Sequence, residues 1–208
     1  RLRLATPVGS ISFQVSLLGR LNVMNLVAVV TALLALEYSS AAIERAMSTL
    51  RPVPGRMELV SKSDAPVHVV VDYAHTPAAL EQALDSLREH TPQRIWCVFG
   101  CGGERDPGKR PEMGAIADRL ADNIVLTNDN PRAEDPLRIL RQIESGIERH
   151  KAVRIPDRRE AIEFAIRQAD SGDLILVAGK GHETTQVVGS ERIPFSDRTV
   201  VANLLEEI

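Results

Sequence analysis

The sequence predicts an α/β protein whose larger part is a Rossmann-like, doubly wound domain with a mainly parallel sheet. From residue 58 onward, short apolar segments alternate with amphipathic helical segments. Near-continuous apolar strands joined by crossover helices are typical of a parallel sheet that is covered on both faces. In addition, polar or glycine-rich segments follow the predicted strands, at the place where open α/β sheets bind ligands.

The first 51 residues do not follow this pattern and are interpreted as a separate, partial unit. Residues 1–15 alternate in polarity around a Pro-Val-Gly-Ser turn, as in a β-hairpin. Helices are expected at 21–37, as a buried helix, and at 41–48. Prolines and a glycine in 52–57 end any helix, so we expect a linker there. The larger domain then covers 58–208.

Periodicity in the larger domain predicts strands and helices in strict alternation. The expected strands are 68–71, 94–99, 123–127, 152–155 and 173–178. The expected helices are 77–89, 111–120, 136–148, 158–169 and a final helix that begins near Asp197. Asp197 is a residue type that can cap this last helix.

Composition limits the possible function classes. A chain of 208 residues with 44% hydrophobic and 25% charged residues suits one full domain plus a smaller piece. The net charge of −3, with basic residues scattered among acids, predicts neither nucleic-acid nor membrane binding. Residues 21–36 are too few to cross a bilayer, which needs about 20 residues. With no targeting segment, a cytoplasmic location is the default.

The two cysteines, Cys97 and Cys101, are expected to be reduced structural thiols. They have no histidine or further cysteine nearby at metal-ligand spacing. No metal site is predicted.

Polar segments follow the predicted strands at 72–77, 100–106, 127–132 and 179–183. Because the carboxyl ends of parallel strands meet at one edge of a sheet, we expect these segments to converge on one site.

Residues 103–110, GERDPGKR, match the phosphate-binding pattern G-x-x-x-x-G-K, except that Arg110 replaces the final Ser or Thr. The hydroxyl that would bind Mg²⁺ is therefore missing, and Pro107 removes a backbone donor. We interpret the loop as a source of two cations for anionic groups, Arg105 and Lys109. A solvated turn is the alternative.

Asp129, Asn130, Pro131 and Arg132 form a compact polar turn in which Pro131 holds Asn130 extended. Arg132 offers the planar, two-pronged recognition of a carboxylate that lysine cannot imitate. The alternative is an Asn-Pro turn with a surface arginine.

Residues 179–183, GKGHE, follow a buried strand. Two glycines permit close approach of the backbone to a ligand, and Glu183 can accept an ammonium group. A flexible turn with solvated charges is the alternative.

Asp72 and His75 straddle another strand end. No G-x-S-x-G nucleophile elbow is present, so these two residues either orient a substrate or nucleotide or close a turn.

DYAHTP, FGCGGERDPGKRP, TNDNPRAEDP and AGKGHE occur in an order and at spacings that resemble the Mur ligases. Among these they are most similar to the branch that adds meso-diaminopimelate to UDP-N-acetylmuramoyl-L-alanyl-D-glutamate. GRLNVMN at 19–25 resembles the end of the family's central ATP-binding domain, and PGRME at 54–58 resembles its interdomain junction. The resemblance, which spans essentially the whole chain, implies that 1–51 is a remnant of the ATP-binding domain and that 58–208 binds the amino acid.

The resemblance also implies two sets of binding residues and assigns no catalytic residue. The residues implied to bind meso-diaminopimelate are Arg105, Asp129, Asn130, Pro131, Arg132, Gly179 and Glu183. Asn130 and Arg132 would lie at the carboxylate of its side-chain end. The residues implied to contact ATP are Asn25, Arg56, Asp72, His75 and Lys109.

The function implied is ATP-dependent amide formation through an acyl phosphate, with Mg²⁺ held mainly by a central domain outside this chain. The partners would be UDP-N-acetylmuramoyl dipeptide and meso-diaminopimelate, without nucleic acid or membrane. The protein would act as a monomer, and these residues alone would not turn over.

Two other readings remain open. One is a different ligase of the superfamily, such as a lysine-adding, folylpolyglutamate or cyanophycin enzyme; the Asn-Pro-Arg segment argues against lysine. The other is a non-catalytic Rossmann-like module that binds a ligand, although no G-x-G-x-x-G follows the first strand, which disfavours NAD.

Overall fold

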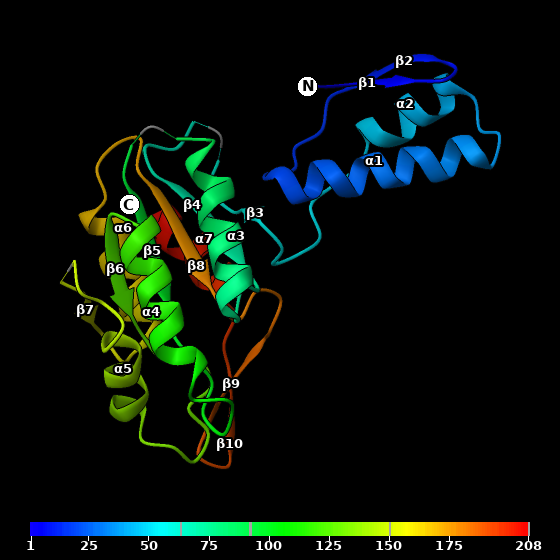
Figure 1. Cartoon of the computed structure of the whole chain (residues 1–208). Helices are drawn as coiled ribbons and strands as arrows, with labels where there is room; N and C mark the ends of the chain where they lie inside the picture. Colours follow the sequence, from blue (N-terminus) through cyan, green and yellow to red (C-terminus); the bar gives the residue numbers. More distant parts are fainter. Residues whose placement is uncertain (63, 92, 150, 208) are drawn as a thin grey trace. The chain divides into compact units, whose positions relative to one another are not determined.

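The computed structural model describes residues 1–62, 64–91, 93–149 and 151–207 (Figure 1). The chain divides into two compact units, one formed by Arg1–Val53 and one that begins at Pro54. The division falls inside the segment expected to be a linker. Gly55, in the second unit, packs closely against a later loop, because a Cβ at this position would lie 2.2 Å from the carbonyl carbon of Gly181.

The first unit is a hairpin with two helices. Its elements are β1 (Leu2–Thr6), β2 (Gly9–Phe13), α1 (Arg20–Ala35) and α2 (Ser40–Ser48). The strands pair antiparallel, and a small core includes Ile11, Phe13, Leu26 and Ile43. The predicted hairpin and helices are thus present.

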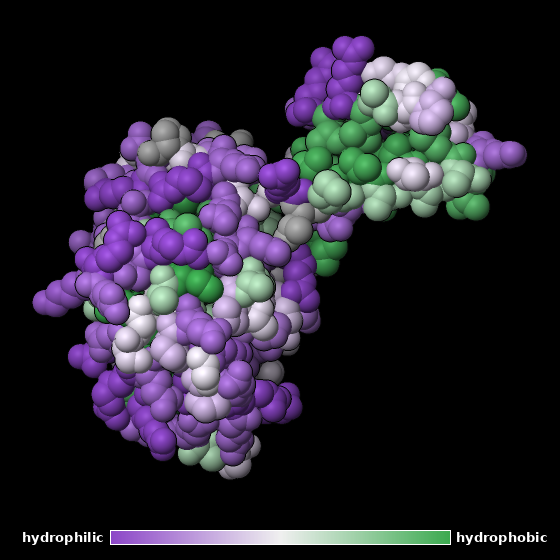
Figure 2. All heavy atoms as spheres, viewed as in Figure 1, coloured by the Kyte–Doolittle hydropathy of each residue, from purple (hydrophilic) through white to green (hydrophobic). Residues whose placement is uncertain are grey.

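The expectation that residues 21–37 form a buried helix is only partly met. Leu26 and Val30 of α1 are buried, but Met24 and Val29 are 61% and 44% exposed. Within the first unit the core contacts of α1 come from the hairpin and α2, which leaves other apolar side chains on its surface. Figure 2 shows hydrophobic side chains, in green, on the surface of the first unit. Among the described helices, none has both the length and the apolar character that a bilayer crossing requires.

The second unit is built on a sheet with the strand order β3-β4-β8-β5-β6-β7. The bounds are β3 (Glu58–Leu59), β4 (His68–Asp72), β5 (Ile95–Phe99), β6 (Asn123–Leu126), β7 (Val153–Arg154) and β8 (Leu174–Ala178). All neighbours pair parallel except β3, a short antiparallel edge strand that the sequence pattern does not predict. The prediction of a mainly parallel, doubly wound sheet is confirmed.

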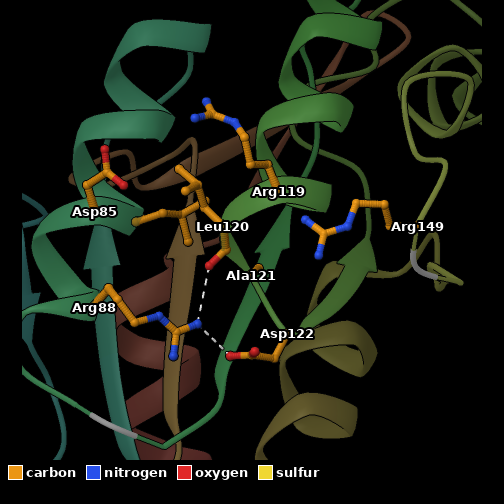
Figure 3. A pocket seen from close by; sticks show the side chains of 8 residues that line it. Asp85, Arg88, Arg119, Leu120, Ala121, Asp122 and Arg149 are labelled. Atoms are coloured by element: carbon orange, nitrogen blue, oxygen red, sulfur yellow. Dashed lines mark hydrogen bonds and ion pairs between the residues drawn. The ribbon is translucent and has the colours of Figure 1, made fainter.

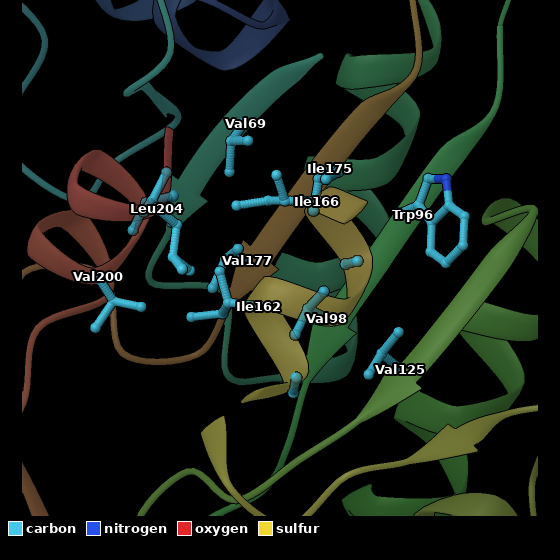
Figure 4. Packing of buried hydrophobic residues seen from close by; sticks show 14 of the residues in the cluster. Val69, Trp96, Val98, Val125, Ile162, Ile166, Ile175, Val177, Val200 and Leu204 are labelled. Carbon is cyan, nitrogen blue, oxygen red and sulfur yellow. The ribbon is translucent and has the colours of Figure 1, made fainter. Parts of the chain in front are cut away.

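Helices cover both faces of this sheet (Figure 1). They are α3 (Pro77–Arg88), α4 (Lys109–Leu120), α5 (Pro136–Glu144), α6 (Arg158–Gln168) and α7 (Asp197–Glu207). Helices α3, α4 and α5 contact one another in series, and α6 contacts α7. Alternate residues of the central strands, such as Val69, Val98 and Val177, pack with Ile162 and Leu204 of α6 and α7 (Figure 4). The residues between them, including the buried free thiol Cys97, fill the other face.

Several helix boundaries differ from the expected ones. Helix α5 ends at Glu144 rather than 148, because Gly146 approaches the carbonyl oxygen of Pro111 so closely that a Cβ would lie 1.9 Å from it. Helix α4 begins at Lys109, two residues before Pro111, since proline is tolerated in a first helical turn.

The expected capping role of Asp197 is wrong. Asp197 is the first residue of α7, and its carboxylate is occupied by the guanidinium of Arg158. The hydroxyl of Ser196 instead accepts a hydrogen bond from the backbone of Thr199 at 3.4 Å.

A second hairpin is absent from the sequence prediction. Strands β9 (Thr185–Val188) and β10 (Glu191–Pro194) pair antiparallel outside the main sheet. One edge of this hairpin forms an isolated bridge between Val188 and Arg132. The hairpin therefore connects the loop after β8 with the loop after β6.

Candidate functional site

The topology creates a crevice at the carboxyl ends of β5 and β8. Strand β5 leads into α4 on one face of the sheet, whereas the neighbouring β8 leads toward α7 on the other face. The two loops therefore diverge, and in open α/β sheets ligands bind at such a switch point.

One hollow of about 450 Å³ lies at this edge. All four polar segments contribute to its lining, which consists of Tyr73, His75, Thr76, Gly102, Arg105, Asp106, Lys109, Asp129, Asn130, Arg132, Gly179 and Glu183. The expectation that these segments converge is confirmed. The volume lies within the range of small-molecule sites.

Arg132 enters the hollow from an uncommon backbone conformation. Its φ is 52°, a left-handed value that most side chains disfavour. The hairpin holds this conformation, because the Arg132 N–H donates to Val187 O at 3.1 Å and the Arg132 carbonyl accepts from Gly189 N at 2.7 Å. Nη1 donates to Gly103 O at 2.8 Å. Nε and Nη2 have no acceptor among the described residues, so both remain available to a carboxylate.

Asn130, Lys180 and Glu183 form a closed set of hydrogen bonds. Asn130 Nδ2 donates to Glu183 Oε2 at 2.9 Å, and Lys180 Nζ donates to Asn130 Oδ1 and to Glu183 Oε2, both at 3.0 Å. Burial would raise the pKa of Glu183, but the hydrogen bonds from Asn130 and Lys180 outweigh this effect and lower the pKa. Glu183 is therefore an anion at neutral pH.

Asp129 lies beside this set. Its Oδ1 is buried, has no hydrogen-bond donor among the described residues, and lies 3.6 Å from Lys180 Nζ, which is an ion-pair rather than a hydrogen-bond distance. Burial raises the pKa of Asp129, while the positive charges of Arg158 and Lys180 oppose that rise. The site thus holds two carboxylates around one ammonium group.

The loop after β5 does not form a phosphate cradle of the P-loop type. Arg110 stands where a P-loop has Ser or Thr, and it is 1% exposed. Its guanidinium donates to both carboxylate oxygens of Glu134 and to the carbonyl of Gly102. Arg110 therefore anchors the loop, and Arg105 and Lys109 are the cations of this loop that line the hollow.

The residues expected at the nucleotide occupy different places. Lys109 Nζ donates to His75 O at 2.8 Å, which ties two lining segments together. Asp72 is next to the hollow, but its two carboxylate oxygens accept from the backbone of Met57 at 2.7 Å and of Ala74 at 2.8 Å. Burial raises the pKa of Asp72 despite these hydrogen bonds. Asn25 is an exposed residue of α1 in the first unit.

Tyr73 is a lining residue that the sequence analysis did not assign. The guanidinium carbon of Arg56 lies 4.1 Å from the centre of the Tyr73 ring, a cation–π contact. The rings of His75 and His182 lie 4.5 and 5.1 Å from the same ring. The sequence feature that could have identified Tyr73 is its position within DYAHTP, between the assigned residues Asp72 and His75. Thr76, Gly102, Asp106 and the buried Lys180 were also not assigned.

A second hollow of about 190 Å³ lies at the opposite, amino-terminal edge of the sheet (Figure 3). It contains arginines, but Arg88 donates to Asp122 at 2.6 Å and to the carbonyl of Leu120, and Arg119 pairs with Glu81 at 2.5 Å. Arg88 and Arg119 are thus engaged by acids of the protein, so the polar hollow at the carboxyl edge is the better candidate site.

Comparison with known proteins gives consistent results. The family model described as Mur ligase, glutamate ligase domain, matches residues 55–181. A Coxiella burnetii protein named UDP-N-acetylmuramoyl-L-alanyl-D-glutamate–2,6-diaminopimelate ligase is 50% identical over 195 residues, which make up 92% of this chain and 39% of that protein. A Geobacillus kaustophilus protein of the same name is 47% identical and covers 99% of this chain and 42% of its own length.

A solved structure titled as a ligase of the same name is similar to this fold. Its TM-score is 0.75 at 41% identity, and the match covers 99% of this chain and 42% of that chain. The chain thus spans about two fifths of the length of these relatives. Because the family model matches more than half of the 208 residues, this chain belongs to the Mur ligase family, in its glutamate ligase domain.

Proposed function

We propose that this chain is the amino-acid-binding part of an ATP-dependent ligase. The reaction would join meso-diaminopimelate to UDP-N-acetylmuramoyl-L-alanyl-D-glutamate, as the names of the relatives state for those proteins. One observation carries the proposal: the guanidinium of Arg132 and the carboxylate of Glu183 line the same hollow. A zwitterionic amino-acid end needs such a pair of opposite charges.

Within this proposal, Arg132 binds a carboxylate of diaminopimelate through Nε and Nη2. Glu183 and Asp129 receive ammonium groups, and the backbone at Gly179, whose φ is 116°, lets the ligand approach closely. Arg105 contributes a further positive charge at the rim. Meso-diaminopimelate differs from lysine by one carboxylate, so a site with a partly buried arginine fork discriminates against lysine.

The amide of Asn130 is largely engaged within the protein, which leaves one Nδ2 hydrogen for a ligand. Pro131 shapes the turn between Asn130 and Arg132. In this proposal both residues position the charged groups more than they bind substrate.

The nucleotide contacts belong to the same proposal. Bound Mg-ATP would supply the phosphoryl group that activates the acceptor carboxylate. Lys109 and His75 lie in the hollow, with Arg56 and Asp72 beside it, and Asn25 is a candidate in the first unit. Among the described residues, no three His, Cys, Asp or Glu side chains are grouped to hold a metal ion. As part of the same proposal, no Mg²⁺ ligand is assigned to this chain, and the protein is a monomer in the cytoplasm.

Calorimetry with meso-diaminopimelate, L-lysine and NAD tests this function. We expect binding of meso-diaminopimelate, binding of lysine that is at least tenfold weaker, and no binding of NAD. Equal binding of lysine, or tighter binding of NAD, would overturn the proposal in favour of another ligase or a nucleotide-binding module. Incubation with ATP, Mg²⁺, meso-diaminopimelate and the nucleotide dipeptide should yield no amide from these residues alone.

A further inference from the structure

Lys180 is a completely buried ammonium group in the middle of the candidate site, and none of the proposed substrate or nucleotide contacts involves it. We infer that Lys180 is a positioning residue: it fixes the Asn130 amide and the Glu183 carboxylate in the one arrangement that leaves Glu183 Oε1 free for the substrate's ammonium group. The role of Glu183 Oε1 as the acceptor for the substrate's ammonium group rests on the proposed function. The arrangement of Asn130 and Glu183 around Lys180 does not.

The contacts of Lys180 show why it is unsuited to bind substrate directly. Its side chain has 0% exposure. Nζ lies 3.0 Å from Asn130 Oδ1, 3.0 Å from Glu183 Oε2 and 3.6 Å from Asp129 Oδ1. Two of the three N–H donors of the ammonium group are engaged by Asn130 and Glu183, and Asp129 Oδ1 lies at an ion-pair distance. Lys180 therefore acts through its neighbours.

The first neighbour is the Asn130 amide, whose orientation is determined by its donors. Oδ1 accepts from Lys180 Nζ and from the backbone N–H of Val187 at 2.9 Å. Both groups can only donate, so a flipped amide would place its NH₂ against two donors. Nδ2 must consequently face Glu183.

The second neighbour is the Glu183 carboxylate. Oε2 accepts from both Asn130 Nδ2 and Lys180 Nζ, whereas Oε1 has no partner among the described residues. Glu183 is 32% exposed and lines the hollow. The protein therefore holds the Glu183 carboxylate through Oε2, and Oε1 remains available to a ligand.

Charge balance indicates which ligand group fits. Asp129 and Glu183 are two acids, and Lys180 supplies one positive charge between them. Arg158 and Asp197, buried beneath, neutralise each other. A substrate ammonium group at Glu183 Oε1 would add a second positive charge beside these two acids. Without Lys180, no protein ammonium group would lie between Asp129 and Glu183.

The variant Lys180→Met tests the arrangement without any ligand, since it preserves chain length and removes the charge. Lys151→Met, at an exposed lysine, is the matched control. Carboxyl ¹³C NMR would follow the titration of Glu183, which faces Lys180, His182 and the more distant charges of Asp129 and Arg158. We expect its midpoint to rise by at least one pH unit in Lys180→Met and to stay constant in the control. An unchanged midpoint would overturn the inference.

Calorimetry tests the functional half. Lys180→Met should bind meso-diaminopimelate at least tenfold more weakly below the midpoint of its own Glu183 titration, and part of the loss should be recovered above that midpoint, where Glu183 is ionised again. A purely structural role would not produce this recovery. Wild-type affinity in Lys180→Met would overturn the inference. If the wild-type protein itself binds no diaminopimelate, the proposed function fails, and the titration of Glu183 still decides the role of Lys180.

A wild-type measurement covers the case in which Lys180→Met does not fold. The ¹⁵Nζ signal of Lys180 should be protected from exchange with solvent, because Nζ is buried and donates to Asn130 Oδ1 and Glu183 Oε2. Glu183→Gln should shift this signal, and Glu112→Gln on the surface of α4 should not. Rapid exchange of this signal with solvent, or no response to Glu183→Gln, would contradict the inference.

Discussion

Arg158 and Asp197 form a two-pronged ion pair in which both side chains are completely buried. Nε lies 2.7 Å from Oδ1 and Nη2 lies 2.8 Å from Oδ2. The same guanidinium donates to the carbonyl of Ala178 at 2.9 Å and to that of Asn128 at 3.3 Å. These carbonyls directly precede Gly179 and Asp129, so the pair ties the ends of β8 and β6 together beneath the site.

Asp197→Asn should destabilise the second unit by about 3–5 kcal/mol, because it leaves a buried guanidinium without a counter-charge. The double variant Arg158→Met/Asp197→Leu should lose less than Asp197→Asn, since it removes both charges. Urea unfolding followed by the fluorescence of Trp96, the single tryptophan, measures this unit. Arg167→Met, at an exposed pair with Glu163, is the control and should cost under about 1 kcal/mol. Equal losses in Asp197→Asn and this control would contradict the argument.

The sequence was sufficient to predict the parts of the fold that depend on local pattern. Strands β4, β5, β6 and β8 are apolar runs, and the helices between them carry their own start signals, such as Thr76 and Pro77 at α3. The convergence of the polar loops followed from parallel topology alone. The general location of the site was therefore predictable.

Features that depend on long-range contacts were not predictable. The β9–β10 hairpin is largely exposed and has no buried residue in either strand, so its sequence shows no regular apolar alternation. The burial of Lys180 arises from the loop after β6, 50 residues away. The left-handed backbone of Arg132 is stabilised by the same hairpin, and arginine has no preference for this conformation. Aspartate is a typical capping residue, but the carboxylate of Asp197 pairs with the buried Arg158 instead of with the backbone N–H groups at the start of α7.

Glu134 should make the stability depend on pH in the acid range. The hydrogen bond from Arg110, followed by that from the Glu104 N–H, lowers the pKa of Glu134 to about 2. A carboxylate with a lowered folded-state pKa stabilises the protein above its unfolded-state pKa near 4.3, and this contribution is lost as the pH falls toward 2. Glu134→Gln should therefore be less stable than wild type at pH 7, and the difference should shrink between pH 5 and 2.

Urea midpoints measured across this pH range provide the test. Glu112→Gln removes an exposed carboxylate from the first turn of α4 and should leave the acid slope unchanged. A constant difference between wild type and Glu134→Gln from pH 7 to pH 2 would show that the pairing with Arg110 does not control the titration of Glu134.

Gly55→Ala should disturb the site more than Gly189→Ala, although both glycines have a left-handed backbone, with φ of 66° and 59°. A Cβ at Gly55 would lie 2.2 Å from the backbone of Gly181 and of His182, whereas a Cβ at Gly189 would meet nothing within 4 Å. Gly189→Ala should thus show only the backbone strain of about 1–2 kcal/mol. Gly55→Ala must also displace residues 181–183, so it should weaken meso-diaminopimelate binding as well as stability. Equal effects of the two variants in urea unfolding and calorimetry would rule out this close packing.

Arg132→Ala and Arg132→Gly separate the binding role of the guanidinium from the strain of its backbone. Both remove the donors that we propose for the substrate carboxylate, so both should weaken meso-diaminopimelate binding by about 10- to 100-fold, equivalent to roughly 1.5–3 kcal/mol for a charged hydrogen-bonded group. Binding of lysine, which lacks the second carboxylate, should change by less than threefold.

Stability should distinguish these two variants, because alanine retains the strain at a φ of 52° and glycine relieves it. Arg132→Gly should be more stable than Arg132→Ala by up to about 1 kcal/mol, since the 1–2 kcal/mol of relieved strain is partly offset by the greater unfolded-state entropy of glycine. Calorimetry with both amino acids and urea unfolding of both variants give the comparison. Equal losses of meso-diaminopimelate and lysine affinity would mean that Arg132 shapes the loop without binding the distinguishing carboxylate. Greater stability of Arg132→Ala would mean that the β9–β10 hairpin, through Val187 and Gly189, imposes no strain at this residue.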